Sequence, residues 1–177
     1  MQVFSRRGFQ LRKASLETRL AYTSFLILTV FGIATLIALS FGRAGTRPSA
    51  VATYYRGGDD EMSFPKTFWQ LVETSHFHLF TIPVVVLILS HLLYATPVSI
   101  RVRVWLTVLT FCGALLDVLG PWAIRYISGL MAYALMLGWL LLGLGSIAII
   151  GITLLSMWSP ENWITRFAPS QRETEDP

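Results

Sequence analysis

Four long apolar runs with almost no charge constrain this 177-residue chain more than any other feature. They cover residues 20–41, 67–95, 104–120 and 127–158. A helix rises 1.5 Å per residue, so about 20 apolar residues cross a hydrocarbon core about 30 Å thick. Only 14% of the residues are charged, whereas soluble domains carry about 25%. The sequence therefore predicts an all-α fold, an integral membrane bundle of four helices.

Basic residues predict the orientation of this bundle. Those before the first run, between the second and third, and after the fourth are Arg6, Arg7, Arg12, Lys13, Arg19, Arg101, Arg103, Arg166 and Arg172. The other side carries Arg43, Arg47, Arg56, Lys66 and Arg125, partly offset by Asp59, Asp60 and Glu61. Cytoplasmic loops are enriched in Lys and Arg. Both termini are therefore expected in the cytoplasm of a bacterium, with residues 42–66 forming a loop outside its inner membrane. Orientation explains the net charge of +4, so no nucleic-acid partner is expected.

The chain divides into a basic N-terminus at 1–19, the bundle at 20–158 and a tail at 159–177. The N-terminal stretch SRRGFQLRK resembles a twin-arginine export signal, whose cleavage would leave three spans. However, the first run is longer than a signal core of about 7–15 residues, and no clean A-x-A site follows. We therefore predict a retained basic anchor. The single cysteine, Cys112, excludes an internal disulfide and covalent c-type haem attachment.

Ionisable side chains interrupt the second and third runs, where their burial in lipid is costly. The second run contains all three histidines and Glu73, and the third contains Asp117. By helix rise, one polar layer is expected in the outer third of the bilayer, formed by Glu73, His76, His78, Asp117 and Arg125. His91 is expected about 20 Å away, near the cytoplasmic end.

Helix geometry limits what the histidines can bind together. At 100° per residue, His76, His91 and Glu73 share a face, whereas His78 points about 140° from Glu73. An ideal helix therefore cannot bring His76 and His78 to one ion. Pro83 is expected to kink this helix and to make room for a ligand.

Several ligands suit this layer. Two self-contained bis-histidine haems are excluded, because the other runs contain no histidine. A b-type haem could use a histidine with Met131 or Met136, or a ligand from another subunit. A quinone headgroup would need the hydrogen-bond donors and proton path that His, Asp, Glu and Arg supply. Copper or zinc could bind His76, His78 and Asp117. The same side chains could instead only hold helices together.

The stretches TSHFHLFTIPVVVLILSHLL and LLDVLGPWAIRY resemble a group of small four-span bacterial membrane proteins associated with cytochromes. The resemblance covers the second and third runs and the start of the fourth. It rests on His76, His78, His91, Asp117, Trp122 and Arg125. It implies a respiratory or electron-transfer setting.

We therefore predict a small membrane subunit of a respiratory or electron-transfer complex that helps to bind haem b or a quinone near the outer face. His76 and His78 would be ligands or hydrogen-bond donors, Asp117 would orient them, and Arg125 would hold a haem propionate or a quinone oxygen. The expected partners are lipids and either other subunits or further copies of the chain. One alternative is a scaffold or assembly subunit without a cofactor. The other is an intramembrane copper or zinc protein.

Overall fold

The computed structural model describes residues 11–58 and 63–159, and it is helical throughout apart from short connections. A 3-10 turn, η1 at Leu11–Lys13, precedes the first long helix. The α-helices are α1 at Leu16–Ala44, α2 at Pro48–Arg56, α3 at Phe68–Tyr94, α4 at Ile100–Tyr126 and α5 at Met131–Trp158. The first six residues of the export-signal motif, 5–10, and the tail from residue 160 onward lie outside the described residues.

The four long helices, α1, α3, α4 and α5, are each long and apolar enough to cross a membrane. Their outer surfaces carry large apolar side chains, such as Leu28 and Phe31 of α1, which are 69% and 65% exposed. A lipid environment accepts such a surface, whereas water would not. The predicted all-α, four-span fold is confirmed.

Local sequence signals explain where these helices begin and end. Ser15 caps the start of α1 by accepting a hydrogen bond from the Thr18 backbone N–H. Thr67 and Gln70 form a reciprocal capping box at the start of α3. Gly45, which follows α1, has a φ of +78°, a conformation that glycine adopts without steric cost.

The structure differs from the sequence-based expectation at the end of α4 and in residues 42–66. The third apolar run was expected to stop at residue 120, but α4 continues through Pro121 to Tyr126. Proline lacks an N–H group, so the helical hydrogen bond to the Asp117 carbonyl is lost there, but a membrane helix can tolerate this. The expected loop at 42–66 contains α2, whose first residue, Pro48, suits the first turn of a helix.

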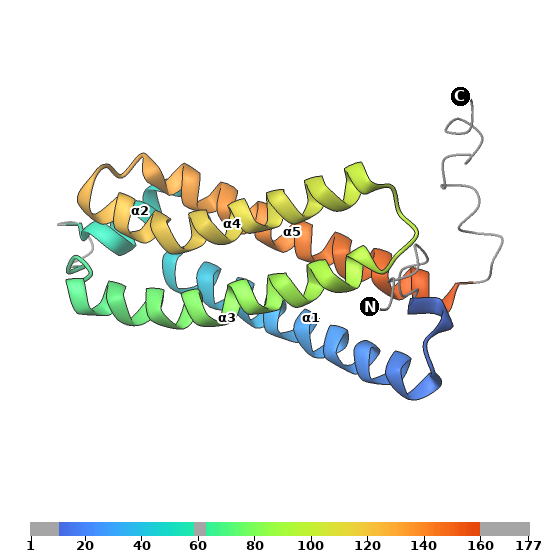
Figure 1. The fold of residues 1–177 in the computed structure, drawn as a ribbon. Coiled ribbons are helices and arrows are strands. Elements are labelled where there is room, and N and C mark those ends of the chain that lie inside the picture. Colours follow the sequence, from blue (N-terminus) through green and yellow to red (C-terminus); the bar gives the residue numbers. More distant parts are fainter. Residues whose placement is uncertain (1–10, 59–62, 160–177) are drawn as a thin grey trace, which may run out of the picture.

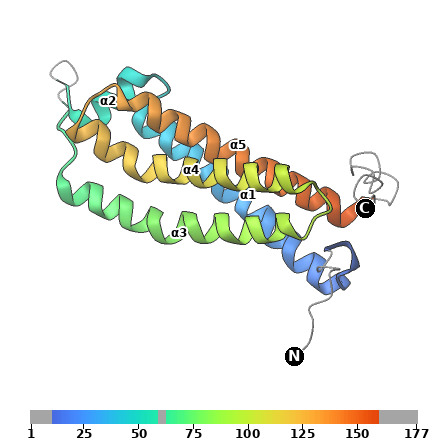
Figure 2. The ribbon, with the colours of Figure 1, turned by 45° about the horizontal axis from the view of Figure 1, so that its top comes forward.

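Figures 1 and 2 show α3, α4 and α5 running side by side, with α2 across one end of the bundle. Helix α1 packs against α5 and α2. The start of α1 and the end of α5 lie at the end opposite α2, as four crossings require (Figure 1). Below, the two ends are called the α2 end and the terminal end.

Glycines bring α4 and α5 into close contact. A Cβ atom on Gly113 of α4 would lie 2.9 Å from the Gly138 carbonyl oxygen of α5. Gly145 lies against Thr110 in the same way. Gly138 and Gly145 of α5 therefore let the backbones of α4 and α5 approach each other.

Candidate functional site

A buried carboxylate links three helices at the centre of the site. The His78 ring of α3 donates from Nδ1 to Asp117 Oδ2 of α4, at 2.7 Å. The Trp139 indole of α5 donates from Nε1 to Asp117 Oδ1, at 3.0 Å. The Asp117 side chain is 4% exposed, and the His78 side chain is 26% exposed. Both carboxylate oxygens thus have partners, which is what a buried acidic group requires.

All three side chains lie at one depth. Counted from the helix termini at the α2 end, His78, Asp117 and Trp139 are each about 12–15 Å along their helices. That depth is inside the hydrocarbon region if the helices span a bilayer about 30 Å thick. The Asp117 contact occupies His78 Nδ1, so Nε2 is the ring nitrogen left for a ligand.

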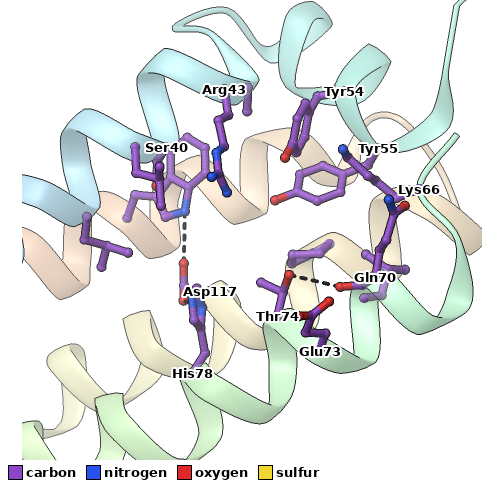
Figure 3. A pocket seen from close by; sticks show the side chains of 16 residues that line it. Ser40, Arg43, Tyr54, Tyr55, Lys66, Gln70, Glu73, Thr74, His78 and Asp117 are labelled. Carbon is purple, nitrogen blue, oxygen red and sulfur yellow. Dashed lines mark hydrogen bonds and ion pairs between the residues drawn. The ribbon is translucent and has the colours of Figure 1, made fainter. Parts of the chain in front are cut away.

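A cavity of about 250 Å³ adjoins this pair at the α2 end. Its polar lining comes from α1, α2, α3 and the segment before α3, and consists of Ser40, Arg43, Tyr54, Tyr55, Lys66, Gln70, Glu73 and Thr74. Figure 3 shows these side chains around the space above His78 and Asp117. The lining therefore offers two cationic groups, several hydroxyl groups and the Glu73 carboxylate to a ligand.

Hydrogen bonds to backbone carbonyls hold α2 and the segment before α3, which line the cavity, in place. Arg56 of α2 donates to the Ile124 carbonyl at 3.0 Å, and the Lys66 N–H donates to the Tyr55 carbonyl at 3.0 Å. Burial raises the pKa of Tyr55 above its usual value, and the nearby Tyr54 and Asp117 add to the effect. The Tyr55 phenol therefore stays protonated and can donate a hydrogen bond.

An apolar groove of about 480 Å³ continues from the polar cavity between α1, α3 and α5. The groove and the cavity share Leu36, Ser40, His78 and Trp139 in their linings. The two spaces therefore meet at the histidine, with polar groups on one side of it and apolar groups on the other.

The structure divides the predicted polar layer. His78, Asp117 and Glu73 line the cavity. His76 is exposed, and its ring lies 4.9 Å from that of Phe80. The separation of His76 from His78 follows from their helical spacing, and Pro83 does not remove it.

The other two predicted residues have separate roles. His91 lies near the terminal end, where its Nδ1 is 2.9 Å from the Leu87 carbonyl oxygen of its own helix. Arg125 does not line the cavity, because its Nε donates to the Lys66 carbonyl at 3.1 Å. Arg125 thus holds the backbone of Lys66 in position, and Lys66 itself lines the cavity.

The expected metal ligands do not come together in the part of the chain that the structure describes. Within residues 11–58 and 63–159, no three His, Cys, Asp or Glu side chains form a group that could hold a metal ion. Met131 and Met136, the alternative haem ligands, pack with Ile124 and Leu135 in an apolar cluster near α2. Neither methionine is in the cavity lining.

Sequence reasoning missed Arg43, Tyr54, Tyr55, Lys66 and Trp139 as site residues. The basic residues served only to predict orientation, and the tyrosines were placed in a loop. For Arg43, Tyr54, Tyr55 and Lys66 the available signal was their position, because they lie on the same side of the predicted bundle as Asp117. Tryptophan is common at membrane interfaces, but Trp139 lies two helical turns inside α5.

Comparison with known proteins supports the architecture. No curated protein and no solved structure matches the chain. Residues 45–163 match a family described as a transmembrane helical domain, Aq_1264_TM. The match covers more than half of the chain and includes α2, α3, α4 and α5. This chain belongs to that family of transmembrane helical domains.

Proposed function

We propose that this protein binds the headgroup of a quinone or quinol in the cavity beside His78 and Asp117, as a subunit of an electron-transfer complex in a bacterial inner membrane. One observation carries the proposal: a histidine oriented by a buried carboxylate faces a polar cavity at membrane depth. By the positive-inside rule, this cavity faces the outer side and both termini are cytoplasmic.

The His78–Asp117 pair suits proton exchange with a quinol. Oxidation of a quinol releases two protons and two electrons, and His78 Nε2 can accept one of these protons. Asp117 then stabilises the imidazolium and holds the ring in one orientation, as carboxylates do beside catalytic histidines. The electrons would pass to a haem- or metal-containing partner subunit.

Other side chains in the cavity lining suit the part of the quinone ring that does not contact His78. Arg43 and Lys66 are cations in this lining, and the protonated Tyr55 is a hydrogen-bond donor. These groups would bind a quinone carbonyl that lies away from His78. Glu73 is exposed at the α2 end and would pass protons on to water.

The lining favours a quinone over haem b. A b-type haem held by His78 alone of this chain would need a further iron ligand, and neither Met131 nor Met136 lines the cavity. We therefore expect a reduced-minus-oxidised visible spectrum of the purified protein to show no haem bands. An α-band characteristic of b-type haem would overturn this choice of ligand.

The paired histidines of α3 allow a matched test. His78→Asn should lower the affinity for tetramethylbenzoquinone by about tenfold or more, equivalent to about 1.4 kcal/mol. The asparagine amide can still donate to Asp117, so the change mainly removes the group at Nε2. Quenching of tryptophan fluorescence measures binding, because Trp139 lines the cavity.

His76→Asn is the control, because His76 is exposed two residues away and lies outside the cavity lining. Its affinity should equal that of the wild type. Equal affinity in all three proteins would show that the quinone does not bind at His78. Failure of the wild type to bind tetramethylbenzoquinone would refute the proposed function and favour a scaffold subunit.

A further inference from the structure

The apolar groove opens toward the lipid. Its rim includes Leu28 and Ile37 of α1 and Phe77 of α3, which are 69%, 40% and 63% exposed. Most of the side chains that line it are apolar, and the Thr29 hydroxyl donates to the Phe25 carbonyl of its own helix at 2.8 Å. The surface of the groove is therefore apolar and accessible from the bilayer.

Two glycines widen this groove without serving helix packing. Gly32 of α1 and Gly143 of α5 both line it. A Cβ atom on either would meet no other described atom within 4 Å, in contrast to Gly113 and Gly138, which fit closely between backbones. A glycine inside a helix costs up to about 1 kcal/mol relative to alanine. Here the missing side chains leave space along the groove.

The cavity and the groove together match an amphiphilic ligand, with a polar part for a headgroup and an apolar part for a tail. The polar part ends at His78 and Trp139, and the apolar part begins at the same residues. Volumes of about 250 Å³ and 480 Å³ suit a ring and part of a tail. A ligand whose ring lies beside His78 would direct an attached chain along the groove.

We infer that the groove holds the polyprenyl tail of the quinone, and that the ligand is a long-tailed quinone that enters sideways from the bilayer between α1 and α3. This inference rests on the proposed function. The tail leaves lipid for a similarly apolar surface, so the groove mainly orients the ring and selects the shape of the chain. A phospholipid acyl chain is the competing occupant.

Filling the groove from Gly143 tests this inference. Gly143→Leu should weaken the binding of a polyprenyl-tailed benzoquinone in nanodiscs by about tenfold, because the leucine occupies the space of the tail. Binding of tetramethylbenzoquinone, which has no tail, should stay within about twofold of the wild type, because Gly143 is outside the polar lining.

Gly151→Leu is the matched control, because Gly151 lies on the same helix, has nothing within 4 Å of its Cβ position and does not line the groove. Gly32→Leu and Gly42→Leu form a second pair on α1 by the same criteria.

The outcomes separate the two claims. If the wild type fails to bind the tail-less quinone, the proposed function falls, and this inference falls with it. If the tail-less quinone binds and Gly143→Leu binds the long-tailed quinone as the wild type does, the tail inference alone is overturned. The groove would then be assigned to a lipid acyl chain.

Discussion

Asp117→Ala should lower the free energy of unfolding by about 1–3 kcal/mol and remove quinone binding. Loss of the carboxylate leaves the part-buried Trp139 Nε1–H without its acceptor, and a donor left unpaired away from water costs about that much. The loss of the His78 contact adds less to the destabilisation, because the His78 ring reaches the cavity and 26% of its side chain is exposed. Unfolding of the purified protein in mild detergent, followed by circular dichroism, gives the stability change.

Asp117→Asn separates the stabilising role of this residue from its role in binding. The amide keeps an oxygen for Trp139, so stability should stay within about 1 kcal/mol of the wild type. A neutral amide cannot stabilise a protonated His78, so the affinity for a quinol should still fall by about tenfold. If Asp117→Asn binds quinol as the wild type does, the carboxylate has only a structural role.

Gly113→Ala should destabilise the bundle by about 3 kcal/mol or more. The added methyl group would lie 2.5 Å from the Leu142 backbone nitrogen and 2.9 Å from the Gly138 carbonyl oxygen. These are backbone atoms, so no side-chain rotation can relieve the overlap, and α4 must move away from α5. Asp117 follows one turn later on α4, so this movement should also weaken its contact with Trp139.

Gly151→Ala is the matched control for that substitution. A Cβ atom there meets nothing within 4 Å, and alanine favours a helix over glycine by about 1 kcal/mol. Thermal unfolding should therefore show a loss for Gly113→Ala and no loss for Gly151→Ala. Equal unfolding temperatures in the two variants would contradict the close helix contact.

The fold could be predicted from the sequence because lipid imposes a simple rule on backbone and side chains. Long apolar runs must be helices, so the four spans were found. The same rule says less about where each helix begins and ends. It placed a boundary at Pro121 inside α4, because proline stops helices in water more strictly than in a packed membrane bundle. It also gave no sign of α2, which is short and lies outside the apolar runs.

The site could be predicted only in part, for a geometric reason. Depth follows from residue counting along a helix, so His78, Asp117 and Glu73 were placed together. Which side chain turns inward depends on how neighbouring helices pack, and the sequence did not determine this for His76 or Arg125. The contribution of Trp139 depends on the glycine contact between α4 and α5, which fixes the rotation of α5 relative to Asp117.

Quantifying the quinone that remains with the purified protein tests the central claim most directly. Wild type, His78→Asn and His76→Asn would be extracted from the membrane in the same native nanodiscs, and the quinone per chain compared with that of the surrounding lipid. We predict quinone enrichment with the wild type and His76→Asn, and none with His78→Asn. No enrichment with the wild type, or equal enrichment in all three, would contradict a quinone site at His78 and Asp117.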